Sequence, residues 1–196
     1  MSIAERKELE KINLKSKILE EAKNIFKEEG YDKISIRNIA SRINYSPTTI
    51  YLYFKNKDDL LKTIIREYYE KLRDEINSII DEKKDPLYTL IKILKAYIYN
   101  AIDPNSNYLI VLKNHKLVSV KKSGQSYKGF ESLERVIEVC MKKKLLKEND
   151  PRLLSQSLWM NNNGIINLLL TEPDYPWVDK DTLINHCVDT FINGLK

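Results

Sequence analysis

The sequence is poor in glycine, proline and cysteine, and each shortage excludes a class of structure. Five glycines and six prolines in 196 residues provide few tight turns. An all-α fold is therefore expected, because leucine, isoleucine, lysine and glutamate dominate. The two cysteines, Cys140 and Cys187, have no partner at metal-binding or redox spacing. Neither a disulfide framework nor a zinc site is expected.

Long apolar runs are also missing. The stretch from Ile165 to Leu170 is interrupted by Asn167 and is far shorter than the roughly 20 residues that cross a bilayer. The amino terminus alternates charges and lacks the apolar core of a secretory signal. We therefore expect a cytoplasmic protein without a membrane segment, and a hydrophobic content of 42% is enough to bury a substantial core.

Catalytic patterns are absent as well. The chain offers no Ser/His/Asp, Cys/His or paired-carboxylate arrangement at usable spacing, and no glycine-rich phosphate loop. We therefore expect no enzymatic activity, no cofactor and no metal ion.

Hydrophobic periodicity and capping signals predict about nine helices. Ile18, Ala22 and Ile25 recur at helical spacing before Gly30, a typical stop signal, and the residues up to Lys17 are expected to fray. Asn56 is predicted to cap a long helix, and three Asp-Pro pairs mark further helix starts. The later helices are expected near residues 86–101, 105–118, 126–145, 151–171 and 179–193.

Charge is distributed unevenly around residues 33–57. No acidic residue lies between Asp32 and Asp58, although acids are abundant on both sides. The same window contains the cations Lys33, Arg37, Arg42, Lys55 and Lys57. A surface that faces DNA phosphates has this composition, because cations placed on phosphates release counterions. A chance gap on a solvated face is the alternative that charge alone leaves open.

The same window predicts two short helices joined by a turn. Ser35 is suited to cap the first helix, and the stretch from Asn44 to Pro47 reads as a turn followed by a second start. This order is typical of a helix-turn-helix, whose second helix enters the major groove. Ile50 and Phe54 should face the core, which directs Pro47, Thr48, Tyr51 and Tyr53 outward.

At these residues the sequence becomes similar to a known family. The segment ILEEAKNIFKEEGYDKISIRNIASRINYSPTTIYLYFKNKDDLL resembles the DNA-binding domain of the tetracycline-repressor (TetR) family over about residues 14–62. Asn44-Tyr45 departs from the family pattern of a glycine followed by an aliphatic residue. Asparagine tolerates the left-handed conformation, so the turn is expected to survive.

The resemblance assigns DNA contacts residue by residue. Ser35 and Lys57 are expected on phosphates, and Arg37 is expected to reach a base edge. The full set of predicted DNA contacts is Ser35, Arg37, Ser46, Pro47, Thr48, Thr49, Tyr51, Tyr53 and Lys57. The partner implied is a palindromic double-stranded operator, bound by a homodimer.

The resemblance also divides the chain into a three-helix DNA-binding domain at residues 1–58 and a helical effector-binding and dimerisation domain at residues 59–196. The last two helices of the family form the dimer. The predicted interface residues are Leu154, Leu158, Ile165, Leu183, Cys187 and Phe191.

The stretch SLWMNNNGIINLLL is similar to a Trp-His-Gly subclass, with Trp159 and Gly164 matching and Asn163 in place of the histidine. On the alternative interpretation, Trp159 is a core aromatic and Gly164 a close helix contact.

A small-molecule effector of unknown identity is implied by the family. The predicted pocket residues are Tyr97, Tyr108, Tyr127, Phe130, Trp159 and Asn163, although aromatic residues at such positions also serve as core packing. The resemblance predicts a repressor that the effector releases from its operator by a population shift. The sequence does not decide between repression and activation of transcription. The alternative is a helical ligand- or partner-binding module whose helix-turn-helix does not read DNA.

Overall fold

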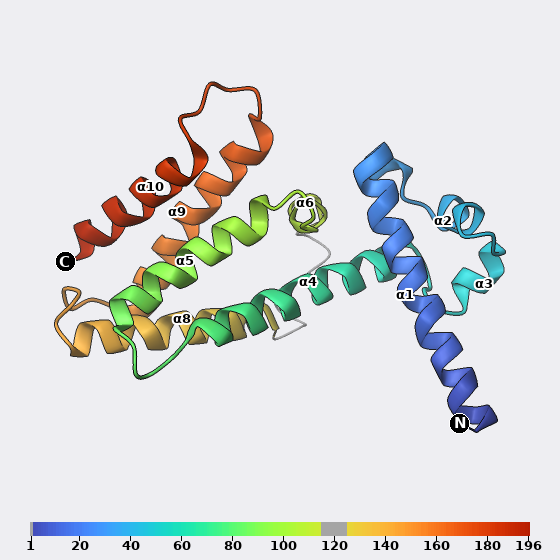
Figure 1. The fold of residues 1–196 in the computed structure, drawn as a ribbon, viewed down its shortest axis with the longest axis horizontal. Helices are drawn as coiled ribbons and strands as arrows, with labels where there is room; N and C mark the ends of the chain where they lie inside the picture. Colours follow the sequence, from blue (N-terminus) through green and yellow to red (C-terminus); the bar gives the residue numbers. More distant parts are fainter. Residues whose placement is uncertain (1, 115–124) are drawn as a thin grey trace. The chain divides into compact units, whose positions relative to one another are not determined.

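The computed structural model describes residues 2–114 and 125–196, with side chains described from Glu131 onward in the second range. Within these ranges the chain is entirely helical, as expected, with nine α-helices and no strand (Figure 1). The helices are α1 (Ile3–Glu29), α2 (Ile36–Arg42), α3 (Pro47–Tyr51), α4 (Lys57–Ile79), α5 (Pro86–Ile102), α6 (Tyr108–Lys113), α8 (Gln125–Lys142), α9 (Pro151–Thr171) and α10 (Lys180–Leu195), with a 3₁₀ turn at Tyr31–Lys33.

Side-chain caps begin several helices where the sequence predicts them. The Asn56 side chain accepts a hydrogen bond of 2.9 Å from the backbone of Asp59 at the start of α4. Asp85 and Asp150 accept backbone bonds at the starts of α5 and α9, each directly before a proline. The proline loses no hydrogen bond at the first helical position, so each Asp-Pro pair is a local start signal.

Two helix starts differ from the prediction by three residues or more, and α8 ends at Lys142 rather than near residue 145. The residues before Lys17 do not fray: α1 begins at Ile3, where Ser2 and Glu5 form a reciprocal capping box. The helix expected at 105–118 begins only at Tyr108, because the Asp103 carboxylate accepts a 2.7 Å bond from the backbone of Asn105 and closes a turn. Residues 115–118 of that prediction lie outside the described part of the chain.

The chain divides into two compact units. The first comprises the residues up to Glu67 together with the segment from Leu109, and the second begins at Tyr68 and includes the carboxy-terminal helices. In the first unit, α1 packs on α2, and α2 packs on α3. The core of this unit contains apolar side chains that are at most 2% exposed, among them Ile18, Ala22, Ile25, Ile39, Ile50 and Phe54.

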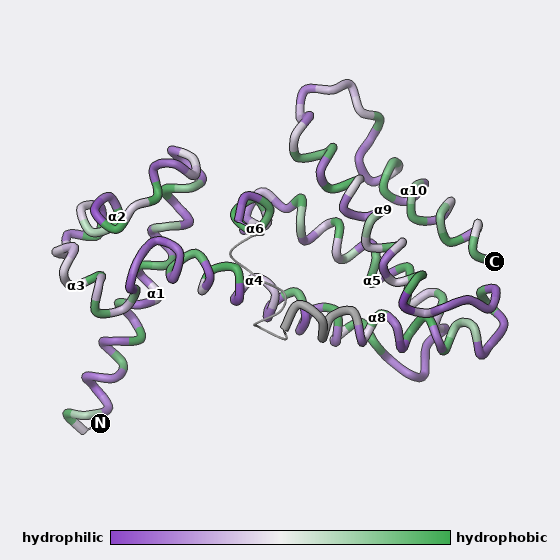
Figure 2. The backbone as a smooth tube through the Cα atoms, turned by 180° about the vertical axis from the view of Figure 1, so that it is seen from behind, coloured by the Kyte–Doolittle hydropathy of each residue, from purple (hydrophilic) through white to green (hydrophobic). Residues whose placement is uncertain are grey.

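The second unit is organised around α5, which contacts α8, α9 and α10 (Figure 1). Its buried side chains include Leu90 and Ile98 of α5, Leu158 of α9 and Ile184 of α10. Figure 2 shows hydrophobic and hydrophilic stretches alternating along these helices, the pattern of amphipathic helices that share one core. Neighbouring helices therefore cover one apolar face of each helix, although α9 also has exposed apolar side chains.

Two isoleucines of α1 allow a test of this packing. Ile18 is completely buried, whereas Ile12 on the same helix is 54% exposed. Ile18→Ala should lower the free energy of unfolding by about 2–5 kcal/mol, because it leaves a cavity in the core. Ile12→Ala should change it by no more than about 0.5 kcal/mol. Urea unfolding followed by circular dichroism checks both values, and equal losses would contradict the assignment of the core.

Candidate nucleic-acid interface

The turn between α2 and α3 is built from short polar side chains. Ser35 accepts a 3.1 Å bond from the backbone of Asn38 and caps α2, and Ser46 accepts a 3.1 Å bond from Thr49 and caps α3. Between the two helices, Asn44 has a φ of 59°. The left-handed conformation expected of this asparagine is therefore confirmed, and it reverses the chain without a glycine.

Two buried anchors set the orientation of α3. Ile50 and Phe54 are 0% and 2% exposed and lie four residues apart, on the side that faces the core. Pro47 and Thr48 are consequently exposed, and Tyr51 is 54% exposed. The structure thus presents a proline, a threonine and a tyrosine from one short helix, while the predicted contacts Thr49 and Tyr53 are half-buried.

Two exposed apolar residues beside α3 were not predicted as candidates. Leu52 is 78% exposed, and Tyr45 in the preceding turn is 43% exposed. The Lys17 ammonium of α1 lies 5.6 Å from the centre of the Tyr45 ring, a cation–π contact. Leu52 directly follows the last residue of α3.

Arg42 is exposed, but acids of α1 already balance its charge. Its guanidinium forms ion pairs with Glu21 at 2.7 Å and Glu29 at 2.9 Å, and it also pairs with Glu28. The hydrogen bond with Glu28 is the main cause of a raised pKa for Arg42. All three acids belong to α1. The Arg42 guanidinium therefore joins α1 to α2 and is not an unpaired group for a phosphate.

The Lys57 ammonium also has a partner within the protein. Its ammonium donates a 3.2 Å bond to the Tyr31 carbonyl and lies 4.0 Å from the centre of the Tyr31 ring. Burial lowers the pKa of Lys57. The Tyr31 hydroxyl donates a 2.6 Å bond to Asn114, directly after α6, and burial raises the pKa of this tyrosine. A phosphate would therefore compete with Tyr31 for the Lys57 ammonium.

The remaining cations of the acid-free window are exposed. Lys33, Arg37 and Lys55 form no ion pair with an acid in the part of the chain that the structure describes. Arg37 lies in the first turn of α2, next to the Ser35 cap. Its guanidinium is the planar fork that base edges and phosphates accept.

In the second unit, four of the six predicted pocket residues lie together. The Asn163 side-chain oxygen accepts hydrogen bonds from the hydroxyls of Tyr108 at 2.8 Å and Tyr97 at 3.4 Å. The Trp159 indole donates a 3.3 Å bond to the Tyr97 hydroxyl. The side chains of Tyr127 and Phe130 lie outside the described residues. The four described residues form a cluster that we call the tyrosine cluster.

One buried hydroxyl beside the tyrosine cluster has no hydrogen-bond partner. Tyr68 is 6% exposed, its ring lies 5.9 Å from that of Tyr108, and its hydroxyl is unsatisfied among the described residues. Burial raises the pKa of Tyr68 strongly, so the hydroxyl keeps its proton and can only gain by donating it to an acceptor. An unsatisfied donor of this kind points to a polar group that binds there.

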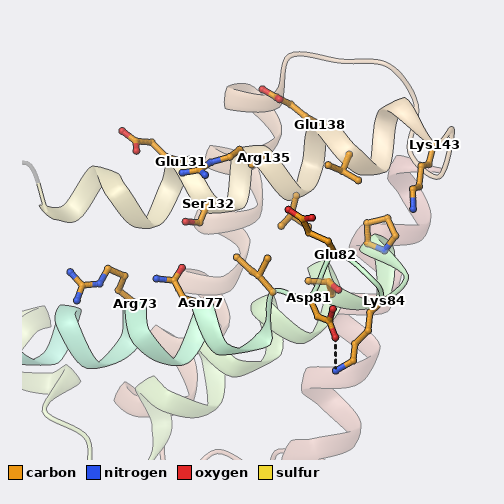
Figure 3. Close-up of a pocket in the computed structure, with 15 residues that line it drawn as sticks. Arg73, Asn77, Asp81, Glu82, Lys84, Glu131, Ser132, Arg135, Glu138 and Lys143 are labelled. Atoms are coloured by element: carbon orange, nitrogen blue, oxygen red, sulfur yellow. Dashed lines mark ion pairs between the residues drawn. The ribbon is translucent and has the colours of Figure 1, made fainter.

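A separate cleft of the second unit lies between α4, α5 and α8. It has a volume of about 900 Å³, and none of the four predicted pocket residues whose side chains are described lines it. Figure 3 shows Ser132 of α8 facing Asn77 of α4 across this cleft, with Arg135 on the α8 side. Its apolar lining includes Ile80, Val136 and Val139. Cationic and acidic side chains line it in equal numbers, as Arg73, Lys84, Arg135 and Lys143 against Asp81, Glu82, Glu131 and Glu138.

The predicted dimer residues fall into two groups. Leu154 and Leu158 are 4% and 1% exposed within one protomer, so their side chains pack inside it and offer no surface to a partner. Leu183, Cys187 and Phe191 recur every four residues along α10 and are half-buried, as is Ile165 of α9. The exposed apolar residues of α9 are Leu153, Met160 and Leu168, together with Trp159.

Two alternatives for α9 are contradicted. Trp159 is 45% exposed, so it is not a core aromatic. A Cβ atom added at Gly164 would meet no heavy atom within 4 Å, so this glycine is not a close helix contact. Both residues are available at the surface of the protomer.

Metal-binding clusters and membrane-spanning helices are both missing from the described ranges. No group of histidine, cysteine, aspartate and glutamate residues there is arranged to hold a metal ion. No helix of the described part has the length and apolar content needed to cross a bilayer.

Comparison with known proteins supports the helix-turn-helix. Residues 18–64 match the family model described as bacterial regulatory proteins, tetR family. The chain is 25% identical over 190 residues to the fatty acid metabolism regulator protein of Bacillus subtilis, covering 91% of this chain and 93% of the relative. It is 24% identical over 165 residues to the nucleoid occlusion factor SlmA of Vibrio cholerae, covering 80% and 84%.

Solved structures support the fold over the whole chain. The structure of the fatty acid degradation regulator FadR from Bacillus halodurans superposes with a TM-score of 0.74 at 24% identity, covering 93% of this chain and 96% of that one. Its helical arrangement is therefore shared beyond the matched amino-terminal segment. The two named relatives are a regulator protein and a nucleoid occlusion factor, in agreement with the expectation that the chain is not an enzyme.

Proposed function

We propose that this chain is a homodimeric repressor that a small molecule releases from a palindromic operator. The chain carries the amino-terminal helix-turn-helix domain of the TetR family and is a DNA-binding transcriptional regulator. The observation that carries the proposal is the anchored α3, which presents Pro47, Thr48 and Tyr51 outward. A helical module that does not read DNA is not favoured, because such a module has no need of this exposed, capped helix.

The proposed DNA contacts follow from exposure. Thr48 and Tyr51 meet base edges or phosphates in the major groove, and Arg37 reaches a base from the start of α2. Ser35 and Ser46 already accept backbone bonds as caps, so their roles are to orient α2 and α3 as well as to touch phosphates. Lys57 binds a phosphate by leaving Tyr31.

The proposed dimer uses the outer faces of α9 and α10. Leu183, Cys187 and Phe191 form a row on α10, and Leu153, Met160 and Leu168 add exposed apolar area on α9. Two such helix pairs form a four-helix interface with two-fold symmetry. That symmetry matches a palindromic operator with half-sites about one helical turn apart.

The proposed effector site is the cleft between α4 and α8. Its volume of about 900 Å³ suits a small molecule, because such sites commonly measure roughly 300–1,000 Å³. Arg135 forms no ion pair in the described part of the chain, and Ile80, Val136 and Val139 provide an apolar wall. Two relatives have names from fatty acid metabolism. A fatty acid, with its carboxylate on Arg135 and its chain along this wall, is the effector that we propose.

The tyrosine cluster is the second candidate for the effector site. The unsatisfied Tyr68 hydroxyl favours it, because an effector with a carbonyl or hydroxyl group would supply the missing acceptor. In either site, the effector acts by favouring a conformation in which the two recognition helices no longer match successive major grooves. The effector lowers operator affinity and leaves the dimer intact.

Two finer assignments are part of the proposal. The Trp-His-Gly subclass is supported by Trp159 and Gly164, whereas Asn163 departs from it and bonds to the tyrosine cluster instead. A cytoplasmic location follows from the access to DNA that a transcriptional regulator needs.

The DNA contacts can be tested by removing one arginine. On a duplex selected by the protein from a random library, Arg37→Ala should lose discrimination worth about 1–3 kcal/mol at one base pair. Arg66 is an exposed arginine of α4, and Arg66→Ala serves as the matched control. Fluorescence anisotropy on matched and mismatched duplexes measures the difference. Unchanged discrimination in Arg37→Ala would remove Arg37 from the reading surface.

The dimer can be tested with two neighbouring residues of α10. Phe191 is half-buried, and Thr190 beside it is exposed. Phe191→Asp places a charge in the proposed interface and should weaken dimerisation at least about 30-fold, the equivalent of about 2 kcal/mol. Thr190→Asp should leave the dimer unchanged. Sedimentation velocity distinguishes monomer from dimer, and an intact Phe191→Asp dimer would place the interface elsewhere.

The effector site can be tested with a series of fatty acids of increasing chain length. Release of the wild-type protein from its selected duplex is the measurement. Arg135→Gln should raise the half-effective concentration by at least about tenfold, because a hydrogen bond to a charged group contributes about 1.5–3 kcal/mol. Arg152→Gln, an exposed arginine of α9, should respond like the wild type. If Tyr68→Phe abolishes the response and Arg135→Gln does not, the effector lies at the tyrosine cluster.

A further inference from the structure

The first half of α1 is a helix that the core of the protein does not require. α1 spans 27 residues from Ile3, but its buried residues begin at Ile18. Residues 2–13 are all exposed, and the family match begins at residue 18. The capping box of Ser2 and Glu5 and an ion pair of 3.0 Å between Arg6 and Glu10 stabilise this extension locally. No packing against the core accounts for it.

Lysines of the extension continue the face of α1 that packs on the domain. Ile18, Ala22 and Ile25 mark that face, with steps of three or four residues. The same steps toward the amino terminus lead to Leu14, Lys11 and Lys7. The face that is apolar where α1 covers the domain thus becomes basic where α1 extends beyond it. Figure 2 shows the extension as mostly hydrophilic.

These lysines line a groove together with residues of the helix-turn-helix. Lys7, Lys11 and Lys17 of α1 lie on one side, and Tyr45 and Tyr53 lie on the other. Asn13, Leu14 and Glu10 complete the lining, and the volume is about 520 Å³. The single acid of the groove, Glu10, is already paired with Arg6. Ammonium and phenol groups that converge on one groove are donors suited to phosphate oxygens.

We propose that this groove holds the DNA backbone beyond the half-site that α3 reads, with Lys7 and Lys11 on phosphates. The proposal rests on the proposed function. Tyr45 and Tyr53 flank α3 on either side in sequence, so the groove adjoins the reading surface within one unit. A helix rises about 1.5 Å per residue. Lys7 therefore lies on the order of 10 Å beyond Leu14, which corresponds to about three base pairs of duplex.

The test combines a double substitution with a change in duplex length. Lys7→Gln/Lys11→Gln removes both ammonium groups and keeps good helix formers. Lys62→Gln/Lys83→Gln removes two exposed lysines away from the groove and is the matched control. Binding is measured by fluorescence anisotropy over a range of salt concentrations. The probes are a selected duplex with long flanks and the same duplex trimmed by about four base pairs at each end.

On the long duplex, the slope of log affinity against log salt should become shallower by about 0.9 for each phosphate that the variant no longer neutralises. On the trimmed duplex, the groove variant and the wild type should bind alike. The control should match the wild type on both probes. Equal slopes on the long duplex, or an equal weakening on both duplexes, would overturn the proposal. If the wild-type protein bound no selected duplex, the proposed function itself would be wrong, and this outcome is distinct from a failure of the groove proposal alone. Circular dichroism verifies that α1 stays helical.

Discussion

The burial of Ile50 and Phe54 is the constraint on which the DNA-facing surface depends. Both side chains are at most 2% exposed and lie one turn apart, so the opposite side of α3 is presented outward. A helix of five residues has too few internal hydrogen bonds to persist alone. Ser46 caps its first turn, and its two anchors fix its direction. The exposure of Thr48 and Tyr51 is therefore a consequence of core packing, and any variant that loosens the core also disturbs the reading surface.

The fate of the cations shows why charge counting is an incomplete guide to a binding surface. Two of the five cations in the acid-free window are used internally, since Arg42 pairs with three acids of α1 and Lys57 binds Tyr31. Fewer cations are therefore left for phosphates than the sequence indicates. Lys7 and Lys11 lie outside that window. Acidic residues next to them in the sequence cancel their charge, so the local net charge does not reveal a basic surface there. Helical spacing separates these lysines from Glu8, whereas Glu10 lines the same groove.

The sequence predicted local features well and tertiary features poorly. The caps at Asn56, Asp85 and Asp150 were correct, because a cap depends on residues within one turn. The start of α6 was wrong, since an Asp-Pro pair also suits a turn, and Asp103 closes one. The grouping of Tyr97, Tyr108, Trp159 and Asn163 was predicted from family resemblance. The α4–α8 cleft was not, because its lining comes from three helices whose polar residues resemble any solvated surface.

The ends of α6 take part in two different hydrogen-bond networks, although the helix has only six residues. At its first residue, the Tyr108 hydroxyl donates to Asn163, and directly after its last residue, Asn114 accepts from Tyr31. Tyr31 also holds the Lys57 ammonium. The bond between Asn114 and Tyr31 thus joins the end of α6 to the residue that holds Lys57, the ammonium for which a phosphate would compete.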